Sequence, residues 1–504
     1  MTVADDHDLH ARELFDTFSQ SMAGPDRLQR MRSDLIGKDT RIAGQFGSRK
    51  LIYADYVASG RALMSVEQFV LSNVLPYYAN SHTEASYCGG AMTAFRRVAR
   101  AIVATCCGAS DEYAVIFTGS GSTAGLNRLV NLLGISSSMA AGTRPRVILG
   151  PYEHHSNILP WRESGAEIVE LREAAKGGPD VDELDAALAG SDARPVVCAF
   201  SAASNVTGII SDVAGLTARV NRAGARMVWD YAGGGPYLPI GMKPAIGASI
   251  DAVVISPHKF VGGPAASGIL IVRRDAVVTD KPTWPGGGTV KFVTPSEHDY
   301  SDRLEVREEG GTPNVIGDIR AALAFLVKDA IGLDKMAERN AELRARALKV
   351  WSGVDQLELL GNCHAESLSI FSFRIGNRDG GYIHQQLVTQ MLSDRFGIQA
   401  RGGCACAGPY VHRLLRIDEE ESARLRRVIA EGDEMQKPGF TRLNLSVLLS
   451  DEEADFILRS VAQLAEDATG FVGRYSVEPS RAIFFPRDRL GADEQDGECP
   501  TCRG

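Results

Sequence analysis

A lysine at the end of an apolar run offers the clearest chemistry in this sequence. Residues 251–255 read DAVVI, and Ser256, His258 and Lys259 follow within the next few positions. Open α/β sheets bind ligands at the carboxyl ends of their strands, so a lysine there can meet a substrate. Partial burial would favour its neutral, nucleophilic amine. The competing interpretation is an ordinary solvated loop lysine.

An acidic residue ends a neighbouring apolar run. Residues 225–230 read ARMVWD, which puts Asp230 where the run stops. A carboxylate at that point is costly to desolvate unless a cation lies beside it. The protonated ring nitrogen of pyridoxal phosphate is such a cation. The same cofactor also needs a lysine, whose amine forms a Schiff base with its aldehyde. Asp230 and Lys259 together therefore predict a pyridoxal-phosphate site.

A glycine-rich turn could hold the phosphate of that cofactor. Residues 118–127 read TGSGSTAGLN and lie between the apolar run 113–117 and a helical pattern. Small residues let backbone N–H groups converge at a helix N-terminus, and Ser122 and Thr123 add hydroxyl donors. The turn lacks the lysine of a nucleotide P-loop and departs from the dinucleotide GxGxxG pattern. We therefore predict a phosphate cup.

Two further side chains could contact a flat cofactor. In YEHHSN, residues 152–157, His154 could stack on the ring, and in SAASNVTG, residues 201–208, Asn205 could donate to a phenolate oxygen. Both residue types also occur in turns for purely structural reasons.

Short apolar runs alternate with helix-length segments, and this pattern predicts the β-sheet that positions these residues. Over residues 113–272 it indicates an α/β fold, a mostly parallel sheet covered by helices. A long helical pattern follows near Asp318. Segments 368–373 and 441–449 then alternate polar and apolar residues, which predicts a half-exposed antiparallel sheet in a smaller α+β domain. We divide the chain into an N-terminal extension (1–48), a large domain (49–330), a small domain (331–477, with an insertion around 410–438) and a flexible tail (478–504).

The charge and composition of the chain disfavour some classes of binding partner. The 504 residues carry 63 acidic and 54 basic side chains, a net charge of −9, which disfavours nucleic acid and anionic membranes. No apolar run reaches the roughly 18 residues of a membrane-spanning helix. Nine scattered cysteines and a polar N-terminal segment favour a reducing cytoplasm over an oxidising compartment.

The order of these motifs resembles class V aminotransferase-fold enzymes, and cysteine desulfurases and selenocysteine lyases most of all. The resemblance covers roughly residues 50–475. It implies pyridoxal-phosphate fold type I, with a large domain built on a seven-stranded sheet. It also implies that the stacking histidine, the ring-oxygen asparagine, the ring-nitrogen acid and the S-x-H-K motif correspond to His154, Asn205, Asp230, Ser256, His258 and Lys259.

Two other features follow from this resemblance. The family's GTPN motif stands here at 311–314, and its threonine, Thr312, would reach the phosphate of a neighbouring subunit, which implies a homodimer. The family usually carries glutamine three residues after the ring aspartate, where this chain has Gly233. Tyr231 is a candidate to compensate for that missing side chain.

A second set of residues could act on the substrate. Residues 397–409, GIQARGGCACAGP, resemble the desulfurase loop, and the family's nucleophile falls on Cys406, two positions after Cys404. A glycine-flanked, partly exposed thiol suits attack on a substrate sulfur. The alternatives are that both cysteines bind a metal or that they are inert small residues. We predict no metal site.

Arginines near that loop could bind the carboxylate of an amino acid. The resemblance assigns this role to Arg442, with Arg401 as the weaker candidate, and a guanidinium fork suits it. The alternative for Arg442 is a surface salt bridge.

Between the cysteine loop and Arg442, residues 412–437 form a charged insertion. This insertion could cover the site, contact a partner or narrow the range of substrates. The CxxC pair Cys499 and Cys502 could be a disordered terminus, a sulfur relay, a thiol sensor or a metal site.

The sequence therefore predicts a cysteine desulfurase-like enzyme. It would remove sulfur from L-cysteine or a related sulfur amino acid through a persulfide on Cys406, and pass it to a sulfur-acceptor protein. A pyridoxal-phosphate C–S β-lyase, a class V aminotransferase or an epimerase would use the same core. A non-catalytic partner-binding homologue is the remaining alternative.

Overall fold

The chain forms two compact units, described here from a computed structural model. It describes residues 3–81, 84–189, 194–378 and 380–487. Within them, the large unit comprises the described residues of 1–36, 56–339 and 364–368, and the small unit those of 37–55, 340–363 and 369–504. No helix in these ranges is long and apolar enough to cross a membrane.

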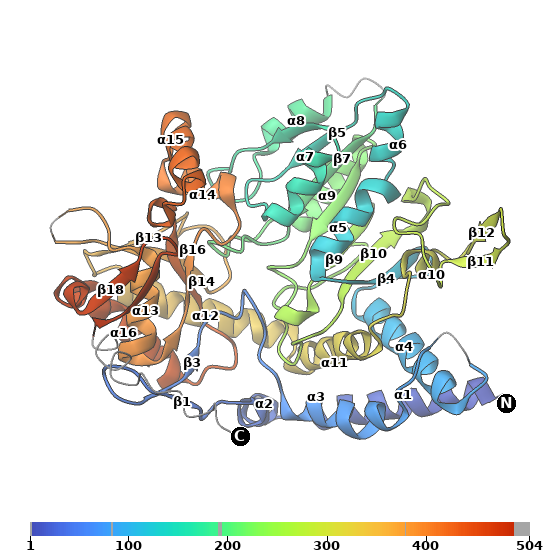
Figure 1. Ribbon diagram of the computed structural model, residues 1–504, viewed down its shortest axis with the longest axis horizontal. Helices are drawn as coiled ribbons and strands as arrows, with labels where there is room; N and C mark the ends of the chain where they lie inside the picture. The colour runs from blue at the N-terminus through green and yellow to red at the C-terminus, as the bar shows by residue number, and fades with distance from the viewer. Residues whose placement is uncertain (1–2, 82–83, 190–193, 379, 488–504) are drawn as a thin grey trace, which may run out of the picture. The chain divides into compact units, whose positions relative to one another are not determined.

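A seven-stranded sheet forms the centre of the large unit (Figure 1). Its order is β4-β10-β9-β8-β7-β5-β6, in which β10 pairs antiparallel with both neighbours and the remaining pairs are parallel. This arrangement confirms the predicted α/β fold with a mostly parallel sheet. The strands are β4 (Tyr113–Gly119), β5 (Arg146–Leu149), β6 (Glu167–Glu170), β7 (Val196–Ser201), β8 (Arg226–Asp230), β9 (Ala252–Ile255) and β10 (Gly268–Arg273).

Helices bury the apolar strands. On one face, Leu126 and Leu129 of α5 (Gly121–Leu132) share a core cluster with Val254 of β9 and Leu270 of β10. Helices α4 (Tyr87–Cys106) and α11 (Val315–Ile331) also belong to this unit, and α11 is the helix predicted near Asp318. Strands buried on both faces explain the continuous apolar runs of the sequence.

The small unit contains a four-stranded antiparallel sheet, as predicted. Its order is β13 (Leu357–Leu359), β14 (Ile370–Ile375), β17 (Phe440–Asn444) and β16 (Arg401–Gly403). The expectation that this sheet is half-exposed is wrong, because every residue of β17 is buried. An early segment of the chain contacts the strand: the N–H of Asn444 donates to the carbonyl of Ala54 at 2.8 Å, and Nη2 of Arg442 donates to Oδ1 of Asp55 at 2.7 Å.

The N-terminal segment is not a detached extension. Helix α1 (Val3–Met22) belongs to the large unit, where the ring of Phe15 lies 5.3 Å from Phe69 and 6.0 Å from Phe95. Residues 37–55 belong to the small unit, in which β3 (Ile52–Tyr53) pairs with β15 (Ile398–Gln399). The predicted boundary at 48 is therefore wrong.

The predicted flexible tail also begins too early. Strand β18 (Tyr475–Glu478) pairs with β19 (Ile483–Pro486) in a hairpin, so residues 478–486 are part of the folded small unit. The CxxC pair Cys499 and Cys502 lies outside the described residues.

Candidate active site

The carboxyl ends of β4 and β9 bring two distant motifs into contact. Helix α5 starts just after β4, and the short helix η4 (Pro257–Lys259) starts just after β9. The N–H of Ser122 donates to Oγ of Ser256 at 2.9 Å, and the two hydroxyl oxygens lie 3.0 Å apart. The predicted phosphate cup and the S-x-H-K motif therefore form one site.

Gly121 allows that contact. Its φ is +60°, and a Cβ built on it would lie 2.9 Å from both Oγ of Ser256 and Cε1 of His258. Such distances are shorter than any side chain tolerates, so only glycine lets the first turn of α5 approach the lysine motif this closely.

The buried carboxylate of Asp230 lies in the same site. Its Oδ1 accepts a hydrogen bond from the N–H of Ala232 at 2.8 Å. Burial raises the pKa of Asp230, while the N–H of Ala232, the charge of Lys259 and the hydroxyl of Ser122 act to lower that pKa. The charge of Lys259 thus acts on the carboxylate of Asp230, and these are the two residues that the cofactor prediction pairs.

His258 adds no further positive charge to this site. Burial, and then the charge of Lys259, lower its pKa to about 4. The imidazole is neutral at neutral pH, so it can serve a cofactor phosphate as a hydrogen-bonding or packing group.

Hydrogen bonds fix the ring of His154. Its Nδ1 accepts from the N–H of Ser156 at 3.1 Å, which puts the proton of a neutral ring on Nε2. The hydroxyl of Ser156 lies 3.1 Å from this Nδ1 and 2.7 Å from Oγ1 of Thr123. This chain of contacts joins the histidine motif to the phosphate cup.

Sequence reasoning missed Glu153, the residue before this histidine. The carboxylate is buried and accepts from the N–H of Ser201 at 2.9 Å, the hydroxyl of Ser201 at 2.7 Å and Nδ2 of Asn157 at 2.5 Å. Burial raises its pKa to about 8. Glu153 therefore ties the histidine turn to the end of β7. The sequence signal that could have indicated Glu153 is the acidic residue at the start of the motif EHH, next to the two histidines.

Tyr231, the first residue after β8, is buried, and burial raises its pKa. That it compensates for the missing glutamine stays a prediction. Gly233, which stands at the position of the family's glutamine, lies next to Asn205: a Cβ built on Gly233 would lie 3.6 Å from Cβ of the buried Asn205.

Thr312 lies exposed in the loop between α10 (Leu304–Glu308) and α11. Asn314, two residues later, caps α11 by accepting from the N–H of Gly317 at 3.1 Å. The contact of Thr312 with a neighbouring subunit stays a prediction.

In the small unit, the two cysteines of the predicted loop occupy a strained turn. Strand β16 ends at Gly403, and four residues separate it from α14 (Gly408–Leu415). The N–H of Ala407 donates to the carbonyl of Cys404 at 3.2 Å, while φ is 49° at Ala405 and 56° at Cys406. A turn with both central residues left-handed is a type I′ turn, which costs about 1 kcal/mol or more for each residue that is not glycine.

Both thiols of this turn are free and half-buried. In the described part of the chain, no three His, Cys, Asp or Glu side chains gather as metal ligands would.

The two predicted carboxylate-binding arginines are cross-strand partners. Arg401 of β16 stands directly opposite Arg442 of β17; the first is exposed and the second buried. Like charges opposite each other on neighbouring strands repel, so a carboxylate is favoured there. Nη2 of Arg442 donates to Oδ1 of Asp55 at 2.7 Å, which is a buried salt bridge rather than a surface one. Substrate binding by either arginine stays a prediction.

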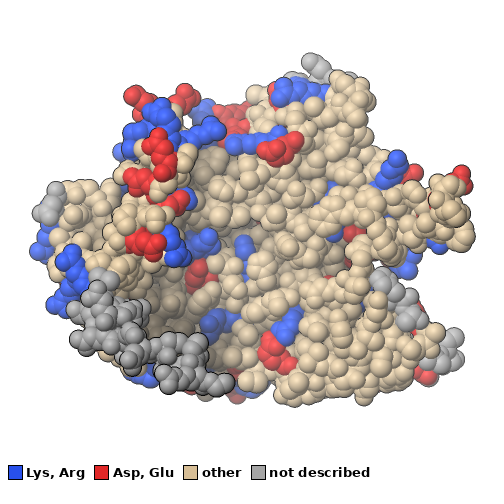
Figure 2. Space-filling model, in the orientation of Figure 1, with Lys and Arg blue, Asp and Glu red and all other residues tan. Residues whose placement is uncertain are grey.

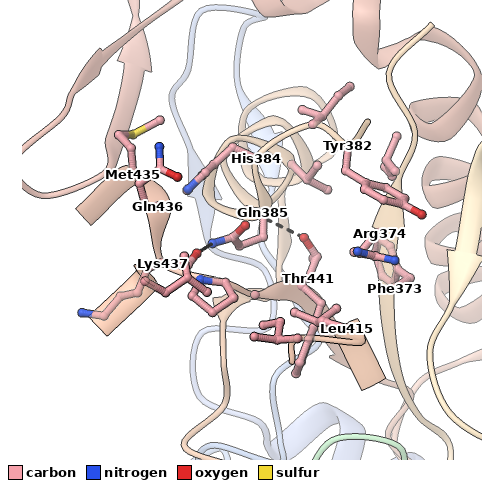
Figure 3. Close-up of a pocket in the computed structure, with 18 of the residues that line it drawn as sticks. Phe373, Arg374, Tyr382, His384, Gln385, Leu415, Met435, Gln436, Lys437 and Thr441 are labelled. Carbon is pink, nitrogen blue, oxygen red and sulfur yellow. Dashed lines mark hydrogen bonds between the residues drawn. The ribbon is translucent and has the colours of Figure 1, made fainter. Parts of the chain in front are cut away.

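The predicted charged insertion folds as a helix over a pocket in the small unit. Helix α15 (Glu419–Ala430) carries intermixed acidic and basic side chains (Figure 2), and Leu425 is its buried residue. The pocket has a volume of about 340 Å³ (Figure 3). At its floor, Nε2 of Gln385 donates to the carbonyl of Lys437 at 3.1 Å, and the hydroxyl of Thr441 donates to the carbonyl of Gln385 at 3.2 Å.

Known proteins are similar to this chain in both sequence and fold. A family described as Aminotransferase class-V matches residues 52–426. A cysteine desulfurase from Klebsiella pneumoniae is 27% identical over 443 residues, 87% of this chain and 98% of that protein. A cysteine desulfurase from an Enterobacter species is 30% identical over 294 residues, which are 57% of this chain and 68% of that protein. A structure of apo cysteine desulfurase from Thermococcus onnurineus has a TM-score of 0.71 at 23% identity, covering 88% of this chain and all of that one. This likeness confirms the predicted fold class.

Proposed function

Because this chain belongs to the aminotransferase class-V family, we propose that it is a pyridoxal-phosphate-dependent, cysteine desulfurase-like enzyme. It takes sulfur from L-cysteine or a related sulfur amino acid as a persulfide on Cys406. The observation that carries this proposal is the contact between Ser122 and Ser256, which brings the glycine-rich turn against the motif that contains Lys259. The names of the relatives support the choice of reaction.

The residues of the large unit fit the cofactor. Gly121 brings the first turn of α5 against Ser256 and His258, and a helix N-terminus favours a phosphate. The buried acid and a lysine lie beside it. When bound, the cofactor supplies a ring that withdraws electrons from the substrate's α-carbon. Lys259 would hold the aldehyde, and the remaining contacts would come from Ser122, Thr123, His154, Asn205, Asp230, Ser256 and His258.

The chain's own groups then perform the reaction. Arg442, assisted by Arg401, binds the α-carboxylate of the substrate. Nζ of Lys259 would accept the α-proton, and the carboxylate of Asp230 would pair with the ring nitrogen of the bound cofactor. The thiolate of Cys406 attacks the substrate sulfur, which leaves a persulfide on the enzyme and releases alanine.

We test this function with L-cysteine as substrate and with alanine, pyruvate and sulfide as readouts. The wild type should form alanine, and Cys406→Ser should lose at least about 99% of that activity, since the nucleophile is gone. Cys363→Ser, which changes another half-buried free thiol of the small unit, is the matched control. Pyruvate that persists in Cys406→Ser would instead identify a C–S lyase. No product from L-cysteine in any variant would point to amino-group transfer or to a larger sulfur substrate.

We also propose a homodimer in which Thr312 reaches the neighbouring subunit's phosphate, and a sulfur-acceptor protein as second partner. The exposure of Thr312 beside the start of α11 supports the first proposal. A monomer in sedimentation velocity at micromolar concentration would refute it. Scattered cysteines keep the cytoplasm as the proposed compartment.

A further inference from the structure

Two thiols stand one residue apart on the loop that carries the proposed nucleophile. Cys404 follows the end of β16, Ala405 is buried, and Cys406 precedes α14. Both thiols are free and half-buried, so both are partly accessible to reagents from solution. The proposed function uses only Cys406.

The turn keeps these two residues close together. It is closed by the hydrogen bond from the N–H of Ala407 to the carbonyl of Cys404. In a β-turn the first and third Cα atoms are about 5.5 Å apart, within the roughly 4.4 to 6.8 Å that disulfides span. The separation of the two Cα atoms therefore lies within the range of a disulfide.

We propose that Cys404 is a resolving thiol for Cys406. This inference rests on the proposed function, which delivers the persulfide. The thiolate of Cys404 attacks Sγ of persulfidated Cys406, the bond from that Sγ to the outer sulfur breaks, and the electron pair leaves with the outer sulfur as hydrosulfide. The products are a Cys404–Cys406 disulfide and one hydrosulfide. A persulfide already has the oxidation level of a disulfide, so the step needs no external oxidant.

The local backbone favours such a step. Ala405 and Cys406 hold left-handed conformations that residues with a Cβ rarely adopt, so the turn is strained. Gly403 before it has a φ of 122° and open space around its Cβ position.

The proposal predicts how the enzyme behaves without an acceptor. Each subunit would release one hydrosulfide and then stop as the disulfide form, until a thiol or dithiol reductant restores both cysteines. Cys404 would thus set whether sulfur leaves as hydrosulfide or stays on Cys406 for transfer.

The experiment is a single turnover of cofactor-loaded, full-length protein with an equimolar amount of L-cysteine and no reductant. Alanine and sulfide are measured, and the tryptic peptide Gly402–Arg413, which contains both cysteines, is weighed by mass spectrometry. In the wild type we expect about one sulfide per alanine and a peptide that lacks two hydrogens. In Cys404→Ser we expect the ratio of sulfide to alanine to fall about tenfold or more, and the peptide to carry one extra sulfur.

The control is the double variant Cys499→Ser/Cys502→Ser, which removes another closely spaced pair of cysteines. It should keep the wild-type ratio and the wild-type peptide. A Cys404→Ser protein that still releases sulfide at the wild-type ratio would overturn the resolving role, and so would a wild-type peptide that keeps the extra sulfur. Failure of the proposed function is seen separately, as absence of alanine in the wild type or as alanine that survives Cys406→Ser.

Discussion

At the scale of single residues, Gly121 controls how closely the two halves of the cofactor site approach. We predict that Gly121→Ala loses most of its bound cofactor, because the new methyl group overlaps Ser256 and His258 and overpacking of this kind costs about 1–3 kcal/mol. Absorbance of the bound cofactor after gel filtration measures the loss. Gly119→Ala is the matched control, since Gly119 also has a positive φ, of 86°, but nothing within 4 Å of its Cβ position. Equal retention in both variants would contradict the prediction.

Glu153 should give the protein a pH-dependent stability. Its pKa, about 8 in the folded state, lies above the value of about 4.3 expected when unfolded. A carboxyl group with a raised pKa stabilises the fold at low pH, and this contribution is lost as pH rises toward the folded pKa. We therefore expect the wild type to lose about 2–3 kcal/mol relative to Glu153→Gln between pH of about 5.5 and 8. The thermal midpoints of both proteins across that range measure it; a constant difference would refute it.

The two arginines should differ in their effect on substrate binding. Arg442→Lys keeps the charge but loses the planar fork, so we expect KM for L-cysteine to rise about tenfold or more. Arg401→Lys, at the exposed cross-strand position, should raise KM only a few-fold. Initial rates of alanine formation give both values. A larger effect at Arg401 would reverse our assignment of the carboxylate-binding residue.

At the scale of elements, apolar runs predict strands only where both faces are buried. Strand β9 lies within the apolar run at residues 251–255, which marks it in the sequence. Strand β6 gives no such signal, because EIVE begins and ends with glutamate and, as the edge strand, is only half-buried. The polar side of β17 was predicted to face water because nothing in its local sequence indicates that Asp55 pairs with Arg442 there.

Helix α15 offers a test of how the insertion is attached. Leu425 is its buried residue, and truncation of a buried leucine to alanine costs about 2–5 kcal/mol. We predict that Leu425→Ala frees the helix and speeds proteolysis within residues 416–438, while the thermal midpoint of the whole protein changes little. Arg426→Ala, on the exposed side of the same turn, is the control. Equal cleavage rates in both variants would contradict this attachment.

At the scale of the whole molecule, the sequence predicts what lies at strand ends and misses what joins distant segments. Lys259, Asp230 and Ser122 were found because each follows an apolar run, and parallel strands bring such positions to one edge. The salt bridge of Asp55 with Arg442 spans 387 positions and carries no local signal. The interleaving of the two units was missed for the same reason, since it depends on pairings such as that of β3 with β15.

That interleaving bears on how the protein is made. Neither unit is one continuous stretch: the small unit takes residues 37–55 from the start of the chain, and the large unit takes 364–368 from beyond its last helix. During synthesis, β3 emerges from the ribosome long before β15 and β17 exist to receive it. The small unit can therefore close only after residue 444 has been made, and neither unit can be produced by cutting the gene at a single point.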